Sequence, residues 1–314
     1  MSSKAEMSSG LTNGVLQGYK SGLGFSRMES GFKKGLLNGI REHNKVQDPT
    51  AGLIADKAPS FFWLADYTNT NGTYPPTSGV NISSTDGPYE LIGGGLMVAA
   101  SNPVFRGNGV LYNKGYVDFA SSADRVSTST TTVGTSELTV FMVLRLSSTL
   151  TGVLLQRISA GNTIGDIQIS SVGGTKIRVS FIGSPNTTSS VYETYEPTIA
   201  TPEYSTPMSN GTNDNKWFIL TVKFDLTQRN GNGSEMEIYI NGVKNMTPVT
   251  TTFTGTSSTN MPTVVTHYGN TTTQSNDVNY RCQIASSVVF NYWLNNTEQA
   301  RIENFYRYYY GHRF

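Results

Sequence analysis

The chain has 314 residues, which is enough for one substantial hydrophobic core and a modest appendage but not for two large independent domains. Only 14% of its residues are charged and its formal net charge is +1 at pH 7, so nucleic acid and acidic membranes are disfavoured as partners. Ser, Thr, Asn and Gly are abundant instead, together with 17 Tyr. We therefore expect a surface wetted by hydroxyl and amide groups.

The first fifty residues contain a glycine repeat with larger apolar residues in between. Glycine recurs at four-residue spacing in two runs, first as Gly10, Gly14, Gly18 and Gly22 and again as Gly31, Gly35 and Gly39. On a helix this spacing lines the glycines along one stripe, where another backbone can approach closely. Because each glycine destabilises a helix by about 1 kcal/mol relative to Ala, such a helix needs a partner. We interpret residues 1–50 as a docking arm, with a flexible Gly-rich leader as the alternative.

Neither a secretory signal nor a membrane span is apparent. The N-terminus lacks the apolar core of a signal, and no stretch reaches the roughly 18 to 20 apolar residues that cross a bilayer. We therefore expect a protein that is made in the cytoplasm. The single cysteine, Cys282, lies in an alternating apolar run, which predicts a small core residue.

Residues 51–314 are predicted to form one all-β domain. Residues 51–100 combine the apolar cluster Phe61–Leu64 with many turn residues, which predicts a strand or two with long loops. Beyond Gly107, short runs of strand-forming residues alternate with turn signals and have no helices between them, as in a sandwich. The predicted strands are Tyr116–Phe119, Leu138–Leu146, Val153–Ile158, Ile164–Ser170, Lys176–Ile182, Trp217–Phe224, Met236–Ile240 and Gln283–Phe290.

Two local signals are sharper than the rest. Asn241-Gly242 supplies the two left-handed residues of a tight type I′ hairpin turn. Asn295 is a polar N-cap before an acidic first turn, and apolar residues follow at helical spacing until Gly311. We therefore expect one short helix at the C-terminal end of the domain.

The order of these segments resembles the concanavalin A-like lectin/glucanase superfamily, in its laminin G-like branch. The resemblance rests on Glu137–Arg145, on Lys216–Asp225 with Trp217 at its start, on the hairpin in Glu237–Lys244, and on Ile284–Phe290 running into the capped helix. It covers roughly Gly107 to Tyr310. It implies a jelly-roll sandwich of two antiparallel sheets, in which Trp217 is large enough to fill the space between them.

Catalysis has little support in the sequence. Glucanases of this superfamily carry Glu-x-Asp-x-Glu on one strand, so that two carboxylates flank the glycosidic bond, and the nearest approach here is Glu235 and Glu237 without a third acidic residue. There is no Gly-x-Ser-x-Gly elbow. The histidines lie far apart without companions at zinc-ligand spacing, at His43, His267 and His312. We predict no catalytic residue, no metal and no cofactor.

Ligand binding remains open on two counts. Lectin-like members of the superfamily often bind Ca²⁺ through Asp and Asn oxygens, and the acidic candidates, each favoured as a turn or cap residue, are Asp214, Asp225 and Asp277. A tyrosine ring can stack on a sugar or pack against the sandwich equally well. The predicted loop 184–215 contains Tyr192, Tyr195 and Tyr204. They are candidate glycan-binding residues, with packing of the loop onto the sandwich as the alternative.

A glycine-striped arm joined to a jelly roll without paired carboxylates predicts a structural component of a larger assembly. Laminin G-like modules of this layout occur as decoration, fibre or minor capsid proteins of bacteriophages and large DNA viruses. We therefore expect a virion structural protein, a homo-oligomer whose partners are other capsid or tail proteins, with a host surface glycan left open as a further partner. The alternatives are a carbohydrate-binding module or adhesin and, less favoured, a glucanase-type hydrolase.

Overall fold

The computed structural model describes the chain between Pro59 and Tyr310, with gaps. The described residues are 59–66, 75–83, 87–88, 96–111, 114–121, 123–128, 132–135, 137–146, 152–159, 165–172, 176–182, 192–195, 217–225, 234–244, 249–251, 263–269 and 282–310. The predicted docking arm, its seven glycines and Tyr204 lie outside these residues. The domain boundary near residue 50 therefore stays a prediction.

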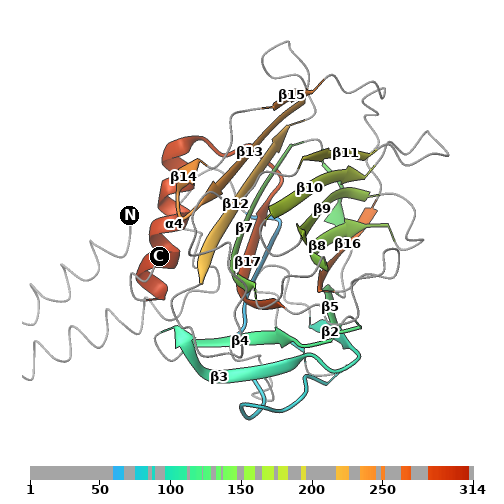
Figure 1. Cartoon of the computed structure of the whole chain (residues 1–314), viewed down its shortest axis with the longest axis vertical. Coiled ribbons are helices and arrows are strands. Elements are labelled where there is room, and N and C mark those ends of the chain that lie inside the picture. Colours follow the sequence, from blue (N-terminus) through green and yellow to red (C-terminus); the bar gives the residue numbers. More distant parts are fainter. Residues whose placement is uncertain are drawn as a thin grey trace, which may run out of the picture. The chain divides into compact units, whose positions relative to one another are not determined.

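Within the described residues the strands form two antiparallel sheets, which confirms the predicted all-β sandwich (Figure 1). One sheet has nine strands in the order β14-β13-β12-β7-β17-β4-β3, with β1 beside β17 and β15 beside β13. Its strands are β1 (Phe61–Leu64), β3 (Val104–Leu111), β4 (Lys114–Phe119), β7 (Glu137–Leu146), β12 (Phe218–Asp225), β13 (Ser234–Ile240), β14 (Val243–Lys244), β15 (Val249–Thr251) and β17 (Cys282–Phe290).

The other sheet, counted over the same described residues, has eight strands in the order β11-β10-β9-β8-β16-β5-β2, with β6 beside β16. Its strands are β2 (Met97–Ala100), β5 (Arg125–Thr128), β6 (Thr132–Val133), β8 (Gly152–Ile158), β9 (Gly165–Val172), β10 (Lys176–Ile182), β11 (Tyr192–Tyr195) and β16 (Thr263–Gly269). Tyr192 and Tyr195 thus belong to a strand, and the prediction of a loop throughout 184–215 is wrong at β11.

The core lies between the two sheets because alternate residues of each strand point inward. It combines side chains such as Met142 of β7 and Leu220 of β12 with Ile169 of β9 and Val179 of β10, each almost fully buried. Cys282 is among these core residues, as predicted. Strands β7, β12 and β17 are buried nearly throughout, which explains why their sequences are almost continuously apolar.

Trp63, and not Trp217, fills the space between the sheets. Trp63 is fully buried, and its ring meets that of Tyr268 on the opposite sheet edge-on at 5.3 Å between centroids. Trp217 is buried on the outer face, where its ring lies 5.2 Å from that of Tyr116. The prediction for Trp217 is wrong because the next residue, Phe218, takes the inward position, and successive strand residues face opposite ways.

The predicted hairpin turn between β13 and β14 is confirmed. Asn241 and Gly242 have φ of 53° and 82°, and Ile240 pairs directly with Val243. The Asn241 side chain also accepts a hydrogen bond from the backbone of Ile219 at 2.8 Å. A Cβ atom at Gly242 would lie 2.5 Å from the carboxylate of Glu303, so that side chain would have to shift, and the positive φ by itself already favours glycine.

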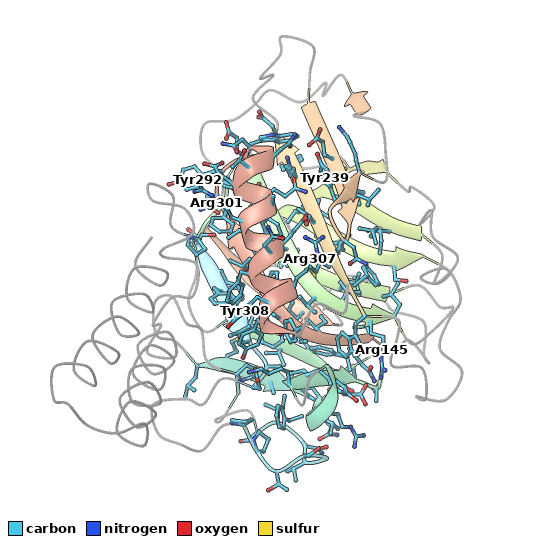
Figure 2. The ribbon with its side chains drawn as sticks, turned by 90° about the vertical axis from the view of Figure 1, so that its left-hand side faces the viewer. Arg145, Tyr239, Tyr292, Arg301, Arg307 and Tyr308 are labelled. Carbon is cyan, nitrogen blue, oxygen red and sulfur yellow. The ribbon has the colours of Figure 1, made fainter. Side chains whose placement is uncertain are left out.

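Helix α4 (Asn296–Tyr309) covers part of the outer face of the nine-stranded sheet (Figure 2). The predicted N-cap is confirmed as a capping box, in which Asn295 Oδ1 accepts from the backbone of Thr297 and Glu298 while the Glu298 carboxylate accepts from the Asn295 backbone. The buried side of the helix includes Tyr306, which accepts a hydrogen bond from Ser286 of β17 at 3.0 Å. No helix among the described residues has the length and apolar character that a membrane crossing requires.

Candidate functional site

The outer face of the eight-stranded sheet carries a line of neutral polar side chains, which we call the polar row. Its members are Ser127 of β5, His267 of β16, Gln156 of β8 and Gln168 of β9. Direct cross-strand pairing joins Ser127 to His267, His267 to Gln156, and Gln156 to Gln168. Because paired residues of neighbouring strands point to the same face, this register places four polar side chains side by side.

Hydrogen bonds connect the polar row in two separate segments. Ser127 Oγ lies 2.6 Å from Nδ1 of His267. Further along, the Gln156 amide donates to Gln168 Oε1 at 3.0 Å, and the Gln168 amide donates to Ser170 Oγ at 3.1 Å. Chains of this kind hold each hydroxyl and amide in one orientation.

His267 is uncharged at neutral pH. Burial, together with the positive charge of the nearby Arg125, lowers the pKa of His267 to about 4. A neutral imidazole has one nitrogen that donates and one that accepts, like the hydroxyl of Ser127 beside it. The polar row therefore presents uncharged groups that can both give and receive hydrogen bonds.

The polar row is accessible at one end. Gln156 and Gln168 are each 2% exposed. Val98 lies on the edge strand β2, pairs with Ser127 and is 42% exposed. Ser127 and His267 are half-buried. We call Val98, Ser127 and His267 the open end of the row. An apolar side chain lies there next to a hydroxyl and an imidazole.

The outer face of the nine-stranded sheet is built differently, from charged residues in close pairs. Glu237 of β13 lies 3.2 Å from Lys223 of β12 and 2.5 Å from Lys244 of β14, and it accepts a hydrogen bond from the Tyr239 hydroxyl at 2.7 Å. Burial raises the pKa of Glu237, but these three donors outweigh burial and hold it below its ordinary value. Glu237 therefore rests as a carboxylate at neutral pH.

A second carboxylate, Glu303 of α4, connects the helix to the sheet. It accepts hydrogen bonds from Thr221 of β12 at 3.0 Å and from Gln299 at 2.9 Å, and it lies 3.8 Å from the guanidinium of Arg307. Arg307 in turn donates to the backbone carbonyl of Asn241 at 2.6 Å. The contacts of Glu303 and Arg307 fix helix α4 against β12 and the hairpin turn (Figure 2).

A third cluster lies where β7 ends, around Arg145 (Figure 2). The guanidinium sits 5.3 Å from the ring centre of Trp217 and 5.8 Å from that of Tyr116, and its Nε donates to Gln283. Stacking a guanidinium on two rings in a buried position is a packing arrangement as well as an electrostatic one. Arg145 is 2% exposed, so its contacts stabilise this end of the sheet in the interior of the protein.

The structure separates most of the residues that the sequence singled out. Glu235 pairs with the buried Asp225 across β12 and β13, whereas Tyr195 pairs with Val179 and Tyr192 with Ile182, at the far end of the other sheet. Outside the described residues lie His43, His312, Asp214 and Asp277. The contribution of His267 to a polar row could not be read from the sequence, because its neighbours come from strands more than a hundred residues away.

Metal binding has no site among the residues that the structure describes. No three of their His, Cys, Asp and Glu side chains come close enough together to hold an ion. Asp225, the one calcium candidate that is described, is fully buried at the end of β12.

Comparison with known proteins adds little beyond the architecture. No protein-family model matches the chain, and no curated protein is similar to it in sequence. Among solved structures it is similar to botulinum neurotoxin domains: the receptor binding domain of the C/D mosaic serotype (TM-score 0.48, 11% identity, 72% of this chain and 50% of that chain), the serotype D ligand binding domain in complex with N-acetylneuraminic acid (0.47, 12%, 73% and 50%) and the type G receptor binding domain (0.46, 16%, 73% and 51%). The chain spans about half the length of these domains. At such values the likeness says nothing beyond the β-sandwich that the strand pairings already show.

Proposed function

We propose that this chain is a non-catalytic display module of a larger assembly, a viral particle in the first instance. In this proposal residues 1–50 attach the chain to other capsid or tail proteins, the module is a homo-oligomer, and the sandwich, of the laminin G-like kind, is exposed. The observation that carries the proposal is the use of two buried carboxylates on the outer face of the nine-stranded sheet. Glu237 and Glu303 are both occupied in joining elements of the sandwich to one another.

The state of Glu237 argues against glycoside hydrolysis in particular. A glycosidase needs two carboxyl groups facing the substrate, one of them kept protonated by a raised pKa. The pKa of Glu237 is lowered, and its oxygens are engaged by Lys223, Lys244 and Tyr239. Glu237 therefore rests as an ionised carboxylate within the scaffold and is not the protonated acid with which glycoside hydrolysis begins.

Attachment through the arm is tested on purified particles. Particles are assembled with the full chain and, in parallel, with a chain that lacks residues 1–45, and both are probed for the sandwich. We expect the full chain to be incorporated and the shortened chain to stay in the soluble fraction, because a glycine-striped helix is stable only against a partner. Equal incorporation of the two chains would refute the anchoring role.

A second candidate function, glycan binding, is favoured by the open end of the polar row. Sugars offer hydroxyls that both donate and accept hydrogen bonds, as well as apolar C–H faces. Ser127 and His267 supply the first kind of contact and Val98 the second. None of these three side chains is charged at neutral pH, which suits contact with the hydroxyl groups of a sugar. Tyr192, Tyr195 and Tyr204 stay candidate glycan-binding residues by prediction alone.

Glycan binding is tested with one charge placed on each outer face. Val98→Asp introduces a carboxylate at the open end of the row, and Tyr308→Asp introduces the same charge on the exposed side of helix α4. Both positions are exposed, so both variants are expected to fold. On a glycan array we expect the full chain and Tyr308→Asp to bind alike and Val98→Asp to lose binding. Unchanged binding by Val98→Asp would place any glycan site elsewhere.

A further inference from the structure

Lys223, Asn296 and Glu237 meet at the first turn of helix α4, where Lys223 and Glu237 are buried and Asn296 lies at the surface. The ammonium nitrogen of Lys223 lies 3.2 Å from Oδ1 of Asn296 and 3.2 Å from Oε2 of Glu237. The Lys223 side chain is 1% exposed, and the rings of Tyr239 and Trp293 lie 5.1 and 5.2 Å from its nitrogen. A primary amine, a carboxamide and a carboxylate are thus held together, and the amine and the carboxylate are largely shielded from water.

We propose that Lys223 and Asn296 join in an isopeptide bond between Nζ and Cγ, with Glu237 carrying the protons. The arrangement contains every group that this reaction requires. An amine held next to a carboxamide reacts far faster than the same groups in solution, because the entropy of bringing them together has already been lost on folding. A neighbouring carboxylate supplies the acid and base steps.

The reaction is balanced without any other reagent. Glu237 takes a proton from the Lys223 ammonium, and the neutral amine attacks Cγ of Asn296. The protonated Glu237 then returns its proton to the departing amide nitrogen, the bond from Cγ to Nδ2 breaks, and the second proton of the attacking nitrogen passes to the released ammonia. The sum is Lys-NH3⁺ plus Asn-CONH2 giving Lys-NH-CO-Asn plus NH4⁺, with no change of oxidation state.

The surroundings favour the first and last of these steps. Burial lowers the pKa of Lys223 in spite of the attraction of Glu237, so removal of its proton is easier than in water. Glu237 is ionised and can receive that proton. Asn296 lies on the exposed rim at the helix N-terminus, which leaves a path for ammonia to escape.

Two neighbouring pairs show why this one is singled out. Lys244 also contacts Glu237, but its side chain is 36% exposed, so its amine is far better solvated. Arg157 donates to the side-chain oxygen of Asn291 at 3.3 Å, yet a guanidinium stays protonated and is not a nucleophile. Lys223 combines a nucleophilic nitrogen, burial, a carboxylate and a carboxamide.

The bond would join β12 to the start of α4, across 73 residues of chain. A cross-link of this span limits the unfolded chain in the way that a disulfide does, and it does so without depending on redox conditions. The inference goes beyond the proposed display function and does not depend on which ligand the sandwich displays.

The test is the mass of the intact, denatured full chain followed by a tryptic peptide map. We expect a mass lower than the sequence requires by one ammonia molecule, and a peptide in which residues 217–229 are joined to residues 282–301. Trypsin does not cleave at a lysine whose amine is acylated, so Lys223 should remain uncut within that peptide. A full mass with separate peptides 217–223 and 282–301 would overturn the proposal. So would a mass loss without joined peptides, which indicates succinimide formation at an Asn-Gly sequence instead.

Variants assign the roles of the three residues. Lys223→Arg keeps the buried positive charge but has no nucleophilic amine, Asn296→Ala removes the amide, and Glu237→Gln removes the proton carrier. We expect all three variants to have the full mass that their sequences require, without the loss of ammonia. Asn304→Ala removes an exposed amide of the same helix and should still contain the joined peptides. Joined peptides in Glu237→Gln would contradict the role of Glu237. If a variant fails to fold, the mass of the chain without substitutions still decides whether the bond forms.

Discussion

The two outer faces of the sandwich use opposite kinds of chemistry. The face of the nine-stranded sheet is closed by helix α4 through charged groups, with Glu237 between two lysines and Glu303 between Thr221, Gln299 and Arg307. The face of the eight-stranded sheet carries a neutral polar row that is accessible at its β2 end. Charged pairs fix an element in place, whereas neutral hydroxyls and amides can exchange protein partners for a ligand. This difference underlies our proposal that the first face is structural and that the second face contacts a ligand.

The largest expected effect is on the closed face. Replacing the fully buried Tyr306 by Ala should lower the free energy of unfolding by about 3 to 5 kcal/mol, because it leaves a cavity under helix α4. Denaturant unfolding measures this loss. Tyr308→Ala on the exposed side of the same helix is the matched control and should change stability by less than about 0.5 kcal/mol. Similar losses in both variants would mean that the helix is not held by its inner face.

The next effect concerns pH and belongs to the other face. In the folded protein the pKa of His267 is about 4, below the ordinary value of 6.5 that applies to the unfolded chain. Between these values the unfolded state binds more protons, so the free energy of unfolding falls as the pH is lowered through this window. The fall is at most about 3 kcal/mol. His267→Gln, which does not titrate, should reduce this slope, and an unchanged slope in urea unfolding would show that His267 is not buried as a neutral ring.

Removal of Glu303 should have a smaller effect than removal of Tyr306. Glu303→Leu leaves Thr221 and Gln299 without their acceptor, and we expect a loss of about 1 to 3 kcal/mol in the free energy of unfolding. Arg301→Leu, at an exposed position of the same helix, serves as the control for the added leucine. If the two leucine variants are equally stable, the contacts of Glu303 do not fasten the helix.

The smallest effect is at the helix N-cap. Asn295→Ala removes the acceptor for two backbone N–H groups and should destabilise the protein by about 1 kcal/mol. Asn304→Ala, in the middle of the same helix, should be close to neutral because alanine favours the helix. A loss at Asn304 as large as that at Asn295 would argue that the cap contributes little.

Local signals in the sequence predicted much of the fold. All eight predicted strands exist, and their boundaries agree with the structure to within two residues. Alternating apolar residues such as Ile177 and Val179, the Asn241-Gly242 turn and the Asn295 cap each depend on neighbours only a few residues away. Strand β16 was not predicted, because Thr266 and His267 interrupt its apolar pattern with polar residues.

The candidate sites could not be predicted, because they depend on pairing between distant strands. Lys223 meets Glu237 through the register of β12 and β13, but its contact with Asn296 requires the helix to return over the sheet. The same holds for Ser127 and His267, which are 140 residues apart. The wrong prediction that Trp217 fills the space between the sheets, a position taken by Trp63, has this origin too. The face to which a side chain points follows from the pairing of its strand.

The most direct test of the division between the faces is amide hydrogen exchange of the full chain, read out peptide by peptide. The account predicts that the amides of helix α4 exchange as slowly as those of β7, because the helix is fixed to the sheet and opens only when the whole sandwich unfolds. Exchange in α4 that is much faster than in β7 would contradict it, because the helix would then open by itself and expose the face that we describe as closed.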